Sequence, residues 1–244
     1  MSSIDEIAPD VFRISTYVKS AGLQFNQFLV RDEQPLLYHT LQNSLFPETL
    51  EAVKSLIDVS SLRWIGFSHF ESDECGSLNR WLAAAPQAVP IAGALAAATS
   101  VNDYASRAPR VLDDNASFAT GRHSFKFLVT PYVPHNWESS LLYDETGQML
   151  FCSDLLLQRG ERPPLAADVL ECAVRDFEQR QLGPFHDSIP YTRNTPGIFA
   201  RLAALQPQVL AIMHGSSFAG DGASVLRGFH RELETVVAPM SCSF

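Results

Sequence analysis

The stretch Ser68-His69-Phe70-Glu71-Ser72-Asp73-Glu74-Cys75-Gly76 places one imidazole and three carboxylates within six positions. It follows directly after the apolar run Leu62-Arg63-Trp64-Ile65-Gly66-Phe67, which predicts a buried strand. After it, the apolar spacing of Leu78, Trp81 and Leu82 predicts the beginning of a helix. The stretch therefore predicts a strand-to-helix turn that carries four possible metal ligands.

Two explanations fit such an acidic turn. It could be a solvated turn that caps a helix, because Asp and Glu favour helix N-termini. That explanation accounts for one or two carboxylates, but not for His69 at two and four residues before Glu71 and Asp73. Three carboxylates this close also repel one another unless a cation holds them together. We therefore predict a metal site at this turn.

The bulk composition sets the class of protein. The chain has 244 residues, enough for one large core, and we expect a single domain over residues 1–244. It is 46% hydrophobic and 18% charged, without the ~18-residue apolar run of a membrane span or a secretory signal at its start. We therefore expect a cytoplasmic protein that does not contact membranes. The net charge of −9 argues against a nucleic-acid partner.

The four cysteines show no CxxC pairing; they are Cys75, Cys152, Cys172 and Cys242. In a chain of this kind we expect small buried residues and no disulfides. Cys75 lies inside the acidic turn, where a redox-sensitive thiol is the alternative, but a packed side chain is the interpretation that we favour.

The order of predicted elements indicates the fold. Alternation and apolar runs predict strands at 11–15, 24–30, 36–39, 62–67, 89–91, 124–129, 140–144, 149–154 and 209–213. Apolar residues at helical spacing predict helices at about 47–57, 81–85, 92–104, 168–181, 196–205 and 223–235. Strand groups alternate with helices in two similar halves, which indicates two sheets packed face to face with helices outside. We predict an α/β fold, a four-layered αβ/βα sandwich.

Three more ligand-type residues stand where predicted strands end. His135 comes shortly after residues 124–129, Asp154 closes the strand at 149–154, and His214 closes residues 209–213. Each is weak evidence alone, because a lone His or Asp at a strand end is more often a cap or a turn residue. Strand ends are, however, where functional loops begin. The coincidence of these three residues with the acidic turn predicts one shared site.

These motifs resemble the metallo-β-lactamase fold, and most closely the diiron domain of the flavodiiron proteins. The resemblance covers nearly the whole chain, on His69-x-Glu71-x-Asp73 and on residues 134–139, 150–154 and 213–215. Hydrolases of this fold usually carry a His at the position of Glu71 and generally bind zinc. A carboxylate there is the mark of the oxygen-handling diiron branch, and oxygen donors suit iron better than zinc.

The resemblance implies a cofactor of two iron ions, with zinc or manganese as alternatives. One ion would be held by His69, Glu71, His135 and Asp154. The other would be held by Asp73, Glu74, Asp154 and His214, so that Asp154 bridges the two ions.

Two positions depart from the pattern of the family. The family has a His where Glu74 stands; if Glu74 ligates, four carboxylates balance two divalent ions and lower the reduction potential. If Glu74 points away, the second ion lacks a ligand and binds weakly or not at all; we favour ligation. His39 stands where the fold usually has an Asp, and it either supports the site through a ring N–H or is an ordinary strand-end residue.

The resemblance implies a protein that binds and reduces dioxygen or nitric oxide, or senses it. No glycine-rich or Ser/Thr-rich phosphate loop for FMN is present, so we expect no flavodoxin-like domain. Electrons would come from a separate flavoprotein or rubredoxin-like donor, and a homodimer is left open. Tyr132 would donate a hydrogen bond to bound oxygen, which makes it a candidate catalytic residue.

Two other functions are left open. One is a metal-dependent hydrolase of an ester, lactone or thioester, in which Asp73 accepts a proton from metal-bound water. Glu71 and Glu74 argue against it, because carboxylates in place of imidazoles make the bound water less acidic. The other is a sensor or binding module whose occupied site changes its contacts with a partner.

Overall fold

The first sheet has inner strands whose side chains are mostly buried on both faces, and more exposed strands at its edges. In the computed structural model, which describes residues 2–237, it has seven strands in the order β1-β2-β3-β4-β5-β6-β7. Their bounds are β1 (Ser3–Ala8), β2 (Val11–Val18), β3 (Leu23–Val30), β4 (Leu36–Tyr38), β5 (Trp64–Gly66), β6 (Val89–Gly93) and β7 (Arg110–Leu112). Pairing is antiparallel from β1 to β4 and parallel from β4 to β7.

The second sheet has six strands within the same described range, in the order β13-β12-β11-β10-β9-β8. Their bounds are β8 (Ser117–Ala119), β9 (Ser124–Val129), β10 (Ser140–Asp144), β11 (Met149–Ser153), β12 (Val209–Ile212) and β13 (Phe218–Ala219). Strands β11 and β12 are parallel neighbours, while the other pairs are antiparallel. The carboxyl ends of β11 and β12 therefore meet at one edge of the sheet.

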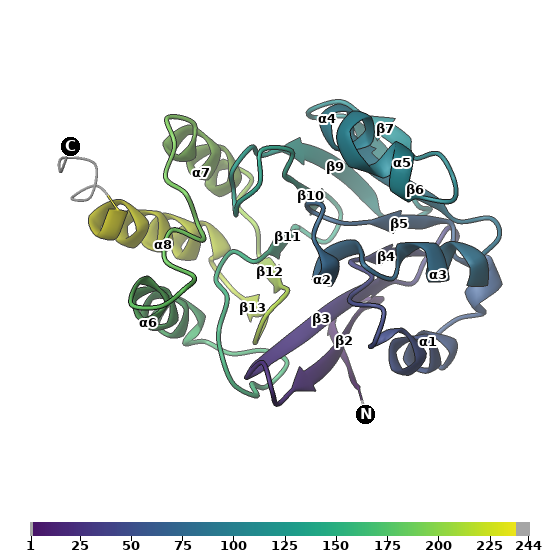
Figure 1. Cartoon of the computed structure of the whole chain (residues 1–244), viewed down its shortest axis with the longest axis horizontal. Coiled ribbons are helices and arrows are strands. Elements are labelled where there is room, and N and C mark those ends of the chain that lie inside the picture. Colours follow the sequence, from purple (N-terminus) through teal and green to yellow (C-terminus); the bar gives the residue numbers. More distant parts are fainter. Residues whose placement is uncertain (1, 238–244) are drawn as a thin grey trace.

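Helices cover the outer face of each sheet (Figure 1). Those next to the first sheet are α1 (Phe46–Lys54), α2 (Ser72–Cys75), α3 (Leu78–Ala84), α4 (Ala94–Ala96) and α5 (Asn102–Tyr104), with a 3₁₀ turn at Val59–Ser61 and a π turn at Ala97–Val101. Those next to the second sheet are α6 (Val169–Gln181), α7 (Thr195–Ala204) and α8 (Gly222–Val237).

Three apolar cores separate the four layers. The central core lies between the sheets, where the rings of Phe28 and Phe151 meet edge to face with centroids 5.7 Å apart. A second core packs the first sheet against its helices around Trp81, and a third packs the second sheet against its helices around Phe229. Neighbouring residues alternate between cores: in β4, Leu37 faces the helices while Tyr38 faces the other sheet. The predicted four-layered αβ/βα sandwich is confirmed.

One predicted helix begins in the wrong place. Residues 92–104 were expected to be helical throughout, but β6 continues to Gly93, which pairs with Leu112 of β7. A parallel neighbour outweighs the helix propensity of Ala92. Helix starts only at Ala94 and runs in three short pieces to Tyr104.

The described cysteines have the burial that the sequence predicts. Cys75, Cys152 and Cys172 are buried and free, as expected, whereas Cys242 lies outside the described residues. Among the helices of residues 2–237, none combines the length and the apolar character that crossing a bilayer requires.

Candidate metal centre

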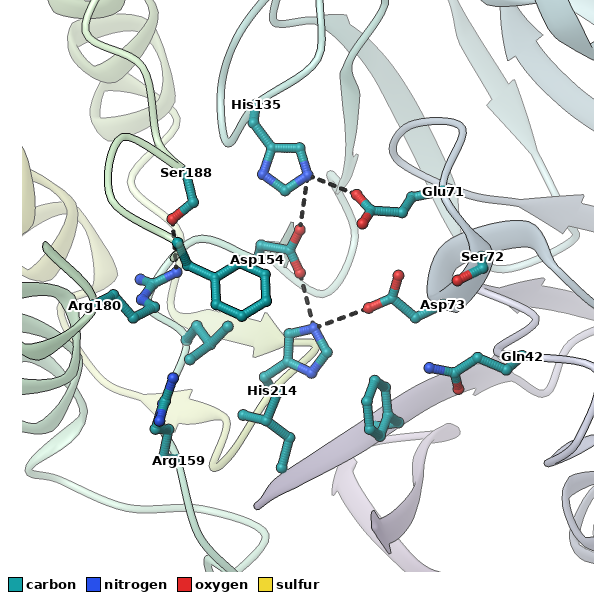
Figure 2. A pocket seen from close by; sticks show the side chains of 14 residues that line it. Gln42, Glu71, Ser72, Asp73, His135, Asp154, Arg159, Arg180, Ser188 and His214 are labelled. Carbon is teal, nitrogen blue, oxygen red and sulfur yellow. Dashed lines mark hydrogen bonds and ion pairs between the residues drawn. The ribbon is translucent and has the colours of Figure 1, made fainter. Parts of the chain in front are cut away.

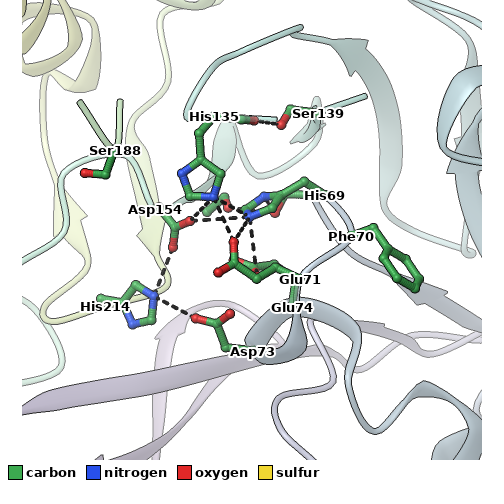
Figure 3. A network of polar contacts seen from close by, with 12 residues as sticks. His69, Phe70, Glu71, Asp73, Glu74, His135, Ser139, Asp154, Ser188 and His214 are labelled. Carbon is green, nitrogen blue, oxygen red and sulfur yellow. Dashed lines mark hydrogen bonds and ion pairs between the residues drawn. The ribbon is translucent and has the colours of Figure 1, made fainter. Parts of the chain in front are cut away.

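Four chain segments bring seven ligand-type side chains together at the carboxyl ends of the strands (Figure 3). The acidic turn between β5 and α3 supplies four of them, and the loop between β9 and β10 supplies one. Asp154 directly follows β11, and His214 stands two residues after the end of β12. The seven residues are His69, Glu71, Asp73, Glu74, His135, Asp154 and His214. All of the residues predicted as ligands therefore lie in one place.

The first donor cluster consists of His69, Glu71, His135 and the Oδ2 atom of Asp154. The two imidazole Nε2 atoms are 2.8 Å apart, and Glu71 Oε2 lies 3.3 Å from His69 and 3.1 Å from His135. Asp154 Oδ2 lies 3.6 Å from His69 Nε2 and 3.4 Å from His135 Nε2. Ligands about 2.1 Å from one ion are separated from each other by about 3.0 to 3.4 Å. The first donor cluster has the spacing of a coordination shell.

The second donor cluster consists of Asp73, His214 and the Oδ1 atom of Asp154. His214 Nε2 lies 2.9 Å from Asp154 Oδ1 and 3.4 Å from Asp73 Oδ2. Burial alone would lower the pKa of His214, but the hydrogen bonds to the Asp154 and Asp73 carboxylates raise it to about 10. Asp154 thus turns one oxygen to each donor cluster, which is the geometry of a bridging carboxylate.

Glu74 is fully buried beside both donor clusters. Its Oε2 atom lies 3.5 Å from His69 Nε2, and neither oxygen accepts a hydrogen bond from the described residues. Burial, and then the negative charges of Asp154 and Asp73, raise the pKa of Glu74 well above its usual range. The resemblance grouped Glu74 with Asp73 and His214, whereas the structure groups it with His69 and Glu71. A buried carboxylate without donors fits a site that takes a cation.

Glu71 is the exposed member of the site, with 52% of its side chain accessible. Hydrogen bonds from His135 and His69 lower its pKa to about 2, although partial burial opposes the shift. An ionised Glu71 between two imidazoles is a hard oxygen ligand at the open side of the first donor cluster.

The first sheet holds His214 in place across the interface between the sheets. The His214 Nδ1 atom lies 2.8 Å from the carbonyl oxygen of Gln24 on β3, so a proton on Nδ1 leaves Nε2 free to bind a metal. Asn26 Nδ2 donates to the carbonyl oxygens of Ile212 and Gly215, at 2.8 and 2.9 Å. These bonds fix the backbone on both sides of His214.

The first donor cluster is held by a different set of contacts. His69 Nδ1 lies 3.0 Å from Ser68 Oγ, which in turn lies 2.6 Å from Ser153 Oγ at the end of β11. The backbone N–H of Phe70 donates to Glu138 Oε1 over 2.8 Å, which ties the acidic turn to the loop that carries His135. Glu138 is buried, and this contact is its anchoring role.

Two other predicted residues lie apart from the donor atoms. Tyr132 is 39% exposed and is not among the residues that line the pocket, so its hydrogen bond to bound oxygen stays a prediction. His39 is fully buried, and neither ring nitrogen has a partner among residues 2–237. Burial lowers the pKa of His39 to about 3, so a neutral ring lies beneath the site.

A pocket of about 300 Å³ opens over the two donor clusters (Figure 2). The lining also includes Gln42, Arg159, Arg180 and Ser188, which the sequence motifs do not indicate. One signal was available: Arg180 continues the buried stripe of α6, three residues after Phe177 and four after Asp176. A cation on the buried face of a helix points to a polar site beneath it.

Two curated proteins illustrate what the chain is similar to. The chain is 29% identical over 140 residues to flavo-diiron protein FprA2 of Clostridium acetobutylicum, covering 55% of this chain and 34% of that protein. It is 27% identical over 212 residues to an anaerobic nitric oxide reductase flavorubredoxin of Salmonella arizonae, covering 84% of this chain and 43% of the relative. The chain thus matches less than half the length of each of these two curated relatives.

A solved structure shares the fold. The rubredoxin oxygen:oxidoreductase of Desulfovibrio gigas superposes with a TM-score of 0.79 at 17% identity, over 94% of this chain and 61% of that one. The family model described as "ODP family beta lactamase" matches residues 23–215, from the start of β3 to the glycine after His214. The chain belongs to this β-lactamase-fold family.

Proposed function

We propose that the chain is a non-haem diiron protein that binds and reduces dioxygen or nitric oxide with electrons from a separate donor protein. The observation that carries the proposal is Asp154, whose two oxygens face two donor clusters 2.9 to 3.6 Å away. The donor chemistry supports iron, because four carboxylates and three imidazoles form a hard, oxygen-rich set. The names of the relatives, a flavo-diiron protein and a nitric oxide reductase, support the same reaction.

In this proposal each of the two ions has its own set of donor residues. His69, Glu71 and His135 would hold one ion, Asp73 and His214 would hold the other, and Asp154 would offer one carboxylate oxygen to each. Glu74 would complete the set, because it is fully buried beside both donor clusters and its nearest donor, His69 Nε2, is 3.5 Å away. When bound, the two irons supply a binding place for a diatomic gas and the electrons that reduce it.

The surrounding residues prepare the site for a reactive gas. Leu23, Phe25 and Leu157 line the pocket and limit the water beside the donor clusters. The Gln24 carbonyl keeps His214 in one tautomer, and the Ser68–Ser153 contact keeps the His69 ring in one orientation. These contacts hold the donor atoms before a ligand arrives, which lowers the reorganisation that binding requires.

The electron donor is proposed to be a rubredoxin-like or flavin-containing protein. The support is the printed names of two similar proteins, a flavorubredoxin and a rubredoxin oxygen:oxidoreductase. The chain matches only part of each, so the donor is proposed by analogy and not from this site.

Anaerobic iron reconstitution tests the proposal. We expect about two iron ions per chain, and an optical change when air or nitric oxide reaches the reduced protein. Oxygen and nitric oxide electrodes, with reduced rubredoxin as the donor, then tell which gas is consumed. Purification with zinc alone, without iron uptake under argon, would contradict the proposal.

A further inference from the structure

The pocket over the donor clusters is much larger than a diatomic gas requires. Its volume is about 300 Å³, whereas one water molecule takes up about 30 Å³ in the liquid. Pockets for small organic ligands begin at about 300 Å³. A ligand larger than dioxygen or nitric oxide therefore fits beside the donor clusters.

One wall of this pocket carries a buried arginine without an anionic partner. Arg180, near the end of α6, is 8% exposed, and its Nη1 atom makes one long contact of 3.4 Å with Ser188 Oγ. Its Nε and Nη2 atoms find no acceptor among residues 2–237. These two N–H groups share one edge of the planar guanidinium, the edge that binds a carboxylate or a phosphate through two parallel hydrogen bonds. An unpaired buried cation is costly, so an anion is the missing partner.

A second arginine stands at the rim of the same pocket. Arg159 is exposed, and its side chain forms no hydrogen bond or ion pair within the described part of the chain. Its backbone N–H donates to Asp176 Oδ2 over 2.7 Å, which fixes the base of the side chain. Figure 2 shows the side chains of Arg159 and Arg180 on the same side of the pocket. Asp176 lies one helical turn before Arg180, and it does not line the pocket.

The charges of the loaded site leave the arginines uncompensated. Glu71, Asp73, Glu74 and Asp154 supply four negative charges, which two divalent ions neutralise. Arg159 and Arg180 then give the lining of the pocket a surplus of two positive charges, since it holds no further acid. Asp176, behind the lining, offsets part of the Arg180 charge. This step rests on the proposed diiron function.

Four of the other lining residues are apolar. Leu23, Phe25, Leu157 and Phe185 face the same space as the two arginines. We infer that the pocket binds a small organic acid, with its carboxylate or phosphate head on Arg180 and Arg159 and its apolar body against these four residues. The site therefore serves an organic acid as substrate or effector in addition to a gas.

Calorimetric titration of the iron-loaded protein under argon tests this inference. The probes are benzoate, its neutral counterpart benzamide, and phenyl phosphate, and metal content is measured for each sample. We expect benzoate or phenyl phosphate to bind and benzamide to bind at least about tenfold more weakly. Whichever acid binds more tightly identifies the head group.

Variants locate the binding site. Arg180→Gln should weaken binding of the acid by about tenfold to hundredfold, and Arg159→Gln by about twofold to fivefold, with unchanged iron content. Arg175→Gln is the matched control, because Arg175 is exposed on the same helix. If Arg180→Gln does not fold, the exposed Arg159→Gln variant carries the test.

Each failure has a separate meaning. Iron-loaded Arg180→Gln that binds the acids as tightly as the unmodified protein would overturn the inference, since the acids would then be bound by the metals alone. Equal affinity for benzoate and benzamide, or no binding of either acid, would overturn it too. Failure to take up iron would instead count against the proposed diiron function.

Discussion

The two donor clusters share Asp154 but differ in how they are built. The first places the donor oxygens of Glu71 and Asp154 3.1 to 3.6 Å from two imidazole nitrogens that are 2.8 Å apart, and it opens to solvent at Glu71. The second has three donor atoms and is closed, with 3% of the His214 side chain exposed. Glu74, which could complete the second, lies within 3.5 Å of His69 in the first.

This difference suggests an order of assembly. A cluster with four donors already spaced as a coordination shell binds its ion more tightly than one that must still recruit a ligand. The second ion is therefore expected to bind more weakly, and to depend on the contacts that hold His214 and on Glu74. Each variant below either removes this difference in affinity between the two clusters or measures it.

Replacing Asp154 should have the largest effect, because it donates to both clusters. Asp154→Ala should lower the iron content after anaerobic reconstitution from about two ions per chain to near zero. Metal analysis after desalting measures this, and Asp103→Ala, at an exposed acid outside the clusters, is the control. Retention of both ions by Asp154→Ala would show that the carboxylate does not bridge.

Replacing His214 should separate the two clusters. His214→Ala removes a donor from the second cluster alone, so about one ion per chain should remain, bound by His69, Glu71, His135 and Asp154. The same metal analysis checks it, with His186→Ala, an exposed histidine, as the control. Loss of both ions would mean that the clusters do not fill independently.

Asn26→Leu should weaken the second cluster without touching a ligand. The change removes two hydrogen bonds to the backbone around His214 and should lower the free energy of unfolding by about 1 to 3 kcal/mol. Affinity for the second ion should fall by about tenfold to hundredfold. Denaturant titration of the metal-free protein and stepwise metal titration measure the two effects. If Asn26→Leu lowered the affinity for the first ion more than the affinity for the second, Asn26 would not support the second cluster. Asn102→Leu, on an exposed helix surface, is the control.

Glu138→Ala should have the smallest effect on metal binding, and that effect should fall on the first donor cluster. It removes one acceptor, that of the Phe70 N–H, and should lower the free energy of unfolding by about 1 kcal/mol. The first ion, and not the second, should bind more weakly in the same titration. Glu138→Gln keeps an acceptor oxygen and should behave like the unmodified protein. If Glu138→Gln instead weakens binding of the first ion as much as Glu138→Ala does, the charge of Glu138 and not its hydrogen bond supports the first cluster.

The fold and most of the site could be predicted from the sequence, because both depend on local patterns. Alternating apolar residues mark β2, β3 and β9, and ligand-type residues stand where β11 and β12 end. Parallel strands bring these ends to one edge, so residues 60 positions apart, Asp154 and His214, become neighbours. That convergence needs only the order of the elements.

Other features depend on contacts that no local pattern carries. Strands β7, β8 and β13 have two or three residues each, too few for alternation to show. Whether Glu74 lies beside the first or the second donor cluster depends on the direction in which the acidic turn runs. Arg180 lies in a stripe of otherwise mostly apolar residues, and only the packed structure shows that this stripe ends at the pocket.

Anomalous diffraction at the iron edge, from crystals reconstituted with iron under argon, tests whether Asp154 lies between two irons. We expect two iron peaks about 3.5 to 4 Å apart, one on either side of the Asp154 carboxylate, with the stronger peak at His69, Glu71 and His135. Two peaks of that kind would support both the diiron centre and the unequal clusters. A single peak between His135 and His214, or iron bound only elsewhere on the chain, would contradict the account.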